Sequence, residues 1–176
     1  MPRKVVVRVT KEIIGAGTLR PYPDKQEGVL YEVPLYRVVV AGTDAKKNAI
    51  TRDFKAYRFG IQLDAQRQVT SPRVVGLADA QSHVLNWSYI TTVKEMAWRV
   101  YAGFFIHRGP DDPATSTYGS IGCIEISGKG QWDLFNKTII EFAGASSAEQ
   151  VSTAKTIRAD YDAAPRPALK RKIKKR

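Results

Sequence analysis

The chain has 176 residues, one cysteine, two histidines and a formal net charge of +11. A hydrophobic fraction of 43% supports a core at this length, so we expect a single domain. One cysteine excludes an intramolecular disulfide and a multi-cysteine zinc site, and we predict neither a metal nor a cofactor.

The positive charge is concentrated near the C-terminus. Residues 165–176 contain seven lysines and arginines and no acidic residue, which leaves +4 for residues 1–164. We predict one folded domain over 1–164 and a disordered basic tail over 165–176, because blocks of like charge repel one another. Such a tail is typical of contact with nucleic acid, an anionic polymer or an anionic membrane, or of a solvated end without a partner.

The N-terminal stretch MPRKVVVRVTKEII is basic but lacks the long apolar region and the cleavage site of a secretory signal. No run of about 18 apolar residues follows it. We therefore expect a protein that is made in the cytoplasm without a signal peptide and that has no membrane span.

In chain order, the sequence first predicts β-strands. Runs of β-branched residues or a two-residue alternation predict strands over 5–9, 29–40, 57–63, 74–75, 84–92, 98–106 and 124–126. Glycine and proline predict a loop over 15–28 and a turn over 42–48. Pro34 predicts an edge or a break in its strand.

The hydrophobic period becomes helical after Gly130. A helix that ends near Gly144 is predicted by four apolar residues at helical spacing, Trp132, Phe135, Ile139 and Phe142. A capping box over 146–149 starts a second helix, which ends before Pro165. Its inner face is predicted to contain Val151, Ala154, Ile157 and Tyr161. The fold class is therefore mainly β (α+β), with two C-terminal helices.

The stretch IHRGPDDPATSTYGSIGCIEI, residues 106–126, contains both His107 and Cys123, sixteen residues apart. A thiol becomes a strong nucleophile as a thiolate, and a nearby imidazole can take its proton. Gly122 permits a tight turn, and the backbone N–H groups of Gly122 and Cys123 can hold an oxyanion. Alternatively, Cys123 is a small buried hydrophobe between isoleucines.

This stretch resembles the catalytic motif of the L,D-transpeptidase catalytic-domain family. That family has a histidine, a loop of similar length, and then Ser-His-Gly-Cys followed by an apolar residue and usually arginine. Four residues stand at matching positions, Ser120, Gly122, Cys123 and Ile124. Ile121 replaces the second histidine and Glu125 replaces the arginine. A divergent group of antibacterial effectors with this fold also lacks the second histidine.

The resemblance implies a β-sandwich-like L,D-transpeptidase fold. It implies that Cys123 attacks a peptide carbonyl in a peptidoglycan stem peptide, while His107 moves the proton. The product would be that of an L,D-carboxypeptidase or an L,D-transpeptidase. An effector of this kind would act in the periplasm or cell wall of a rival cell. Its partners would then be a cognate immunity protein and a secretion-system carrier.

Four further residues are candidates for substrate binding. Arg108, Tyr118 and Ser120 lie within the motif, although loop packing also explains them. Glu125 is expected on the same strand face as Cys123. It can meet an amino group of the substrate, pair with Arg108, or be an exposed strand residue without a role.

The alternative function is a basic, non-enzymatic module that binds nucleic acid or another polyanion. The tail favours it, but the aromatic residues form core stripes and not a stacking surface, so nucleic acid is disfavoured. We expect His83 to be structural or exposed, and the pair Asp111–Asp112 to form a turn.

Overall fold

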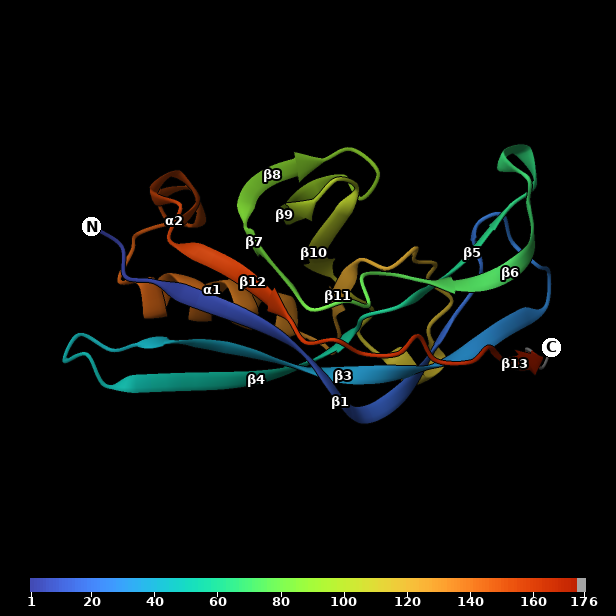
Figure 1. Cartoon of the computed structure of the whole chain (residues 1–176), viewed down its shortest axis with the longest axis horizontal. Helices are drawn as coiled ribbons and strands as arrows, with labels where there is room; N and C mark the ends of the chain where they lie inside the picture. The colour runs from blue at the N-terminus through green and yellow to red at the C-terminus, as the bar shows by residue number, and fades with distance from the viewer. Residues whose placement is uncertain (174–176) are drawn as a thin grey trace.

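The computed structural model describes residues 1–173 and is mainly β, with two helices (Figure 1). The large sheet consists of β1 (Val5–Leu19), β3 (Val29–Thr43), β4 (Ala49–Tyr57), β7 (Gln81–Val84), β8 (Asn86–Ile90), β9 (Glu95–Tyr101), β10 (Phe104–Arg108), β11 (Ile124–Ile126), β12 (Ile157–Tyr161) and β13 (Lys170–Ile173). The small sheet consists of β2 (Tyr22–Pro23), β5 (Gly60–Asp64) and β6 (Val69–Val75). The helices are α1 (Gln131–Ala143) and α2 (Ala148–Ala154).

The large sheet has the order β7-β12-β1-β3-β4-β11-β10-β9-β8, and β13 pairs with β3 beside this path. In Figure 1 the two helices lie toward the end where the β3–β4 hairpin turns, and β5 and β6 lie at the opposite end. Within residues 1–173, no helix combines the length and the apolar character needed to cross a membrane. The predicted mainly β class with two helices is confirmed.

Strand β1 is longer than predicted. It pairs with β3 as far as Leu19, so the glycine-rich start of the predicted loop over 15–28 belongs to the sheet. Register shifts between Val9 and Gly15 bend the strand and absorb its irregular sequence. Pro34 lies within β3, after the segment that pairs with β13 and before the segment that pairs with β4. The prediction of an edge position for Pro34 agrees with this gap between two partner strands.

The predicted single strand over 57–63 is divided between two strands, because the chain breaks between β4 and β5 at Arg58. This side chain has 0% exposure and bonds main-chain oxygens, which lie 2.9 Å away on Thr10 and 3.2 Å away on Leu77. Its guanidinium also donates to the carbonyl of Asp162. The two-residue alternation predicts that Arg58 faces solvent. In the fold it is buried and its guanidinium links three segments of the chain by hydrogen bonds.

The predicted strand over 98–106 is two strands joined by a tight turn. Strands β9 and β10 form an antiparallel hairpin, and Ala102 at its tip has a φ of 49°. Apolar residues continue through the turn, so their alternation does not show the reversal. The hairpin places His107 within its second strand, directly after the last residue of the predicted strand.

The first predicted helix is confirmed as α1, which ends at Gly144 in the left-handed region with a φ of 63°. The second is shorter than predicted, because α2 ends at Ala154 and Ile157–Tyr161 is strand β12. Strand β12 pairs with β1 and β7, and burial alternates along it because Ile157, Ala159 and Tyr161 face the core. The helix-like spacing of Ile157 and Tyr161 in the sequence is coincidental.

The predicted disorder of the basic tail is wrong for residues 170–173, which form β13 against β3. Lys170 and Lys172 both form ion pairs with Glu32. Hydrogen bonds from these two lysines lower the pKa of Glu32 to about 2. Opposite charge on the neighbouring strand therefore lies beside both lysines and reduces their mutual repulsion. Residues 165–169 of the tail form neither helix nor strand, and residues 174–176 lie outside the described residues.

The main core lies against strands β10 and β11. Ile106, Ile124 and Ile126 are fully buried in one cluster with Phe135 and Ile139 of α1. Burial of each such side chain is worth about 1.5–3 kcal/mol. Because side chains alternate along a strand, the neighbouring residues of β10 and β11 project to the opposite face.

Candidate active site

The site is built on the parallel pair of β10 and β11. Ile106 pairs with Ile124, His107 with Glu125, and Arg108 with Ile126. With this register, His107 and Glu125 are direct neighbours, and Cys123 follows diagonally on the same face. His107 and Cys123, which are sixteen positions apart in sequence, therefore lie on the same face of two adjacent strands.

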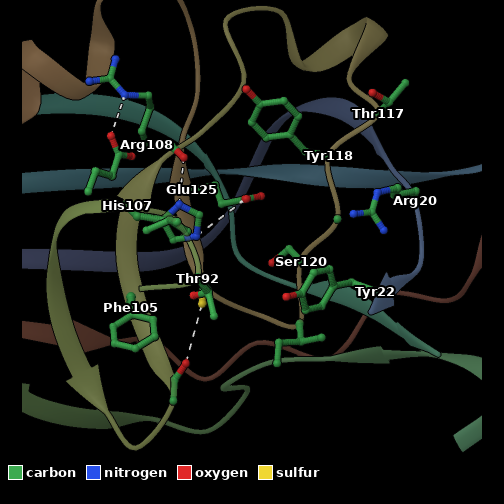
Figure 2. Close-up of a pocket in the computed structure, with 16 residues that line it drawn as sticks. Arg20, Tyr22, Thr92, Phe105, His107, Arg108, Thr117, Tyr118, Ser120 and Glu125 are labelled. Atoms are coloured by element: carbon green, nitrogen blue, oxygen red, sulfur yellow. Dashed lines mark hydrogen bonds and ion pairs between the residues drawn. The ribbon is translucent and has the colours of Figure 1, made fainter. Parts of the chain in front are cut away.

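That face opens into a cleft of about 730 Å³ (Figure 2). Its walls come from the β9–β10 hairpin, the β8–β9 turn, the segment before β11 and the segment that leads into β2. The lining residues are Arg20, Tyr22, Thr92, Val93, Glu95, Gly103, Phe105, His107, Arg108, Thr117, Tyr118, Gly119, Ser120, Ile121, Cys123 and Glu125. Every predicted catalytic or substrate-binding side chain is among them.

Cys123 lies at the base of the cleft and is 9% exposed. Its Sγ donates to the carbonyl oxygen of Gly103, 3.9 Å away, at the tip of the β9–β10 hairpin. Burial raises the pKa of the thiol to about 11, while a hydrogen bond from the Phe105 backbone acts in the opposite direction. At neutral pH the resting group is therefore a thiol, and it requires a base to become a nucleophile.

His107 is buried, and its two ring nitrogens have different surroundings. Nδ1 lies 2.8 Å from the carbonyl oxygen of Arg108, which can only accept, so Nδ1 carries the proton. Nε2 faces Oε1 of Glu125 at 3.7 Å, too far for a hydrogen bond. Burial lowers the pKa of His107, so the imidazole is neutral at pH 7. A neutral ring with an unbonded Nε2 is the form that can accept a proton.

Glu125 is only 1% exposed, so it is not an exposed strand residue. Burial raises its pKa to about 8, which leaves a neutral carboxyl beside a neutral imidazole at pH 7. Oε2 of Glu125 has no hydrogen-bond partner among residues 1–173. Tyr57 on β4 lies opposite Glu125, and burial, with a smaller effect of Glu125, raises the pKa of that phenol.

The turn before Cys123 is held by its own side chains. Ser120 Oγ accepts the Gly122 N–H at 3.1 Å, so Ser120 fixes the turn and the predicted oxyanion donor on Gly122 is already bonded. Gly122 has a φ of 105°, and a Cβ there would lie 2.5 Å from the Cα of Gly76. Only glycine fits this position.

Of the three alternatives for Glu125, the pair with Arg108 is wrong. Nε of Arg108 lies 3.3 Å from Glu95, and its Nη2 lies 3.7 Å from Asp133. Figure 2 shows the Arg108 side chain directed away from His107. Tyr118 is half exposed at the cleft. His83 stacks on Tyr101 and is absent from the cleft lining.

Sequence analysis missed the residues that reach the cleft from other elements. Arg20 and Tyr22 come from the segment between β1 and the small sheet, and Thr92 and Glu95 come from the β8–β9 turn. No short-range pattern marks them, because they are far from the motif in sequence. Asp112, in contrast, caps the turn at Pro113–Thr115 as predicted. Within residues 1–173, no three His, Cys, Asp or Glu side chains gather as a metal site.

Comparison of the chain with protein-family models, with curated proteins and with solved structures gives no match. The geometry of the cleft and the motif over residues 106–126 are the features that indicate a function.

Proposed function

We propose that this protein is a cysteine acyl-transfer enzyme that acts on peptidoglycan stem peptides, of the L,D-carboxypeptidase or L,D-transpeptidase type. One observation carries the proposal. The Cys123 thiol shares a cleft with a His107 imidazole whose Nδ1–H is bonded to a main-chain carbonyl and whose Nε2 is available. A nucleophile, a base and a group that orients the base are the parts that acyl transfer needs.

The reaction starts from two neutral groups. Sγ of Cys123 attacks the peptide carbonyl carbon while its proton passes to Nε2 of His107. The tetrahedral intermediate then collapses, the C–N bond breaks, and His107 gives the proton to the leaving amine. A thioester on Cys123 remains. Attack by water on the thioester completes hydrolysis, whereas attack by an amine completes transpeptidation or amino-acid exchange.

Glu125 acts through His107 in this scheme. When the imidazole is protonated, Oε1 of the neutral Glu125 carboxyl lies next to Nε2, and the partial negative charge of this oxygen faces the new positive charge. Glu125 is therefore a positioning residue that stabilises the imidazolium. It occupies the position where the related family usually has arginine.

The choice of stem peptides as substrate, and the assignment of the fold to the L,D-transpeptidase type, rest on the motif resemblance. The same resemblance supports the further proposal of an antibacterial effector that acts in the periplasm of a rival cell, with an immunity protein as partner. The alternative function is a basic module that binds nucleic acid or another polyanion through its tail. Two lysines of the basic tail are engaged by Glu32.

The proposal is tested by incubation with purified muropeptides followed by mass analysis. Hydrolysis removes a terminal residue, and exchange replaces it with an added amino acid. Cys123→Ala and His107→Ala are each expected to reduce turnover about 10³-fold or more, and the double variant should be little worse than either single variant. His83→Ala is the matched control, since this histidine lies outside the cleft, and it should retain activity. Substantial turnover by Cys123→Ala would refute the assignment.

A further inference from the structure

Two arginines line the cleft, and their surroundings differ. Arg108 is neutralised by ion pairs with Glu95 and Asp133. Arg20 instead donates from Nη1 to the Pro21 carbonyl at 2.9 Å. None of the ion pairs within residues 1–173 includes Arg20. Its positive charge is thus uncompensated by any carboxylate of the described chain.

Arg20 is also held in place. Its backbone N–H donates to the Tyr118 carbonyl at 2.9 Å, and it forms a parallel bridge with Gly119. The guanidinium carbon lies 5.6 Å from the centre of the Tyr22 ring. A Cβ on Gly119 would lie 3.2 Å from that carbon and 3.0 Å from the Tyr22 Cβ. The glycine therefore makes room for a cation that is ordered before any ligand binds.

The acidic residues of the cleft do not cancel this charge. Glu95 is paired with Arg108, and Glu125 is protonated at neutral pH because of its burial. Figure 2 shows the Arg20 guanidinium directed into the cleft from the side opposite His107. The cleft therefore has a proton acceptor at one side and an uncompensated cation at the other.

We propose that Arg20 is a specificity-determining residue that binds a carboxylate group of the substrate peptide. This inference rests on the proposed function and deepens it, since it names the chemical group that orients the peptide across Cys123. A guanidinium matches a carboxylate with two parallel hydrogen bonds, which fix direction as well as position. A stem peptide offers two such groups. One is its C-terminal carboxylate, and the other is the side-chain carboxylate of diaminopimelate where that diamino acid is the third residue.

The first experiment measures peptide binding to full-length Cys123→Ala protein by calorimetry. Three tetrapeptides are compared. The first contains diaminopimelate and a free C-terminus, the second is its C-terminal amide, and the third contains lysine in place of diaminopimelate. Removal of the carboxylate that Arg20 binds is expected to weaken binding about tenfold to a hundredfold. The peptide that loses affinity identifies which carboxylate is bound.

The second experiment adds Arg20→Met to the same protein. The apolar side chain keeps contact with Tyr22 but removes the charge. We expect the first peptide to bind as weakly as the peptide that lacks the critical carboxylate, so that the difference between them disappears. Arg73→Met is the matched control, because Arg73 on β6 bonds Gln62 and is absent from the cleft lining. Thermal unfolding of both variants establishes that they fold.

Three results would overturn the inference: equal binding of the three peptides, no binding of any of them, or a preference that survives Arg20→Met. The first two need no Arg20 variant, so they hold even if Arg20→Met does not fold. Turnover of muropeptides by the wild-type chain is a separate readout. Turnover without a carboxylate preference removes the role of Arg20 alone, whereas a preference without turnover removes the proposed reaction alone.

Discussion

Arg58 and Glu125 are both buried ionisable residues, but their surroundings are opposite in character. The Arg58 guanidinium donates to carbonyl oxygens of three separate segments and packs near the rings of Tyr36, Phe59 and Tyr161. Glu125 has one unpartnered oxygen and one distant contact, to His107. Arg58 lies outside the cleft lining, whereas Glu125 belongs to it.

The difference teaches how a buried charge can be classified. A buried polar group without partners costs about 1–3 kcal/mol, so a fold keeps it only where something else benefits. The hydrogen-bond donors of Arg58 are satisfied by the protein itself, so this residue stabilises the fold. Glu125 has an oxygen without a hydrogen-bond partner, and it faces both an imidazole and a cleft. This is the environment of a functional group.

The largest expected effect concerns Arg58 and tests whether this residue stabilises the fold. Arg58→Met leaves partly buried carbonyl oxygens of β1 and of the segments at Leu77 and Asp162 without donors. We expect a loss of about 3–5 kcal/mol in the free energy of unfolding, measured by chemical denaturation. Arg52→Met on β4 is the control and should lose less than about 1 kcal/mol, since Arg52 is partly exposed. Equal losses in the two variants would contradict the role given to Arg58.

The second prediction concerns the pH dependence that Glu125 confers. Its pKa rises from 4.5 in the unfolded chain to about 8 in the fold. The neutral form is favoured by folding, so this stabilisation is complete below pH 4.5 and is lost as the pH rises through 8. Between these values the wild type should lose stability relative to Glu125→Gln by at most about 1.4 kcal/mol per pH unit.

Denaturation of both proteins at pH 5, 7 and 9 measures this difference, and exposed Glu149→Gln on α2 serves as the control. Parallel pH curves for wild type and Glu125→Gln would show that Glu125 is ionised throughout, and would place it with Arg58 as a satisfied charge.

The third prediction concerns the thiol next to Glu125. With a pKa of about 11, Cys123 carries roughly a hundredfold less thiolate at pH 8 than an ordinary thiol with a pKa near 9. Alkylation by iodoacetamide should be slow and should still accelerate above pH 9. Mass spectrometry measures it directly, because the chain has one cysteine. The same chain unfolded in urea is the control, and equal rates in the two states would mean that the thiol is already activated.

The smallest effect is expected for Glu32, a charge that is paired like those of the comparison but lies at the solvent-exposed surface. Glu32→Gln removes the partner of Lys170 and Lys172. Because solvent and salt screen such pairs, we expect only local loosening of β13. Amide hydrogen exchange should accelerate in residues 170–172 and remain unchanged in β10 and β11. Glu12→Gln, which breaks a different surface pair, is the control. Unchanged exchange in β13 would show that its backbone pairing alone holds it.

Local sequence patterns predicted the elements whose own residues show one unambiguous hydrophobic period. Helix α1 follows from its apolar spacing and Gly144, and the motif strand β11 follows from Ile124 and Ile126. Strand β12 was missed because its alternation competes with a helical spacing over the same residues. Pairing with β1 decides between the two, and that pairing joins segments at opposite ends of the chain.

The candidate site divides in the same way. His107, Cys123 and Glu125 could be assigned to one face, because two short strands carry them. Arg20 could not, since its approach depends on the long β1 and on the bridge to Gly119. The partner of Arg108 was also unpredictable, because Glu95 and Asp133 reach it from β9 and α1.

The position of β12 has a consequence for synthesis on the ribosome. This strand is made after β1 and β7, yet it lies between them in the finished sheet. Until residue 161 has been translated, both strands present an unpaired edge, and such edges invite pairing with other chains. Folding of the sheet therefore follows most of translation, and the nascent chain requires protection from aggregation during that interval.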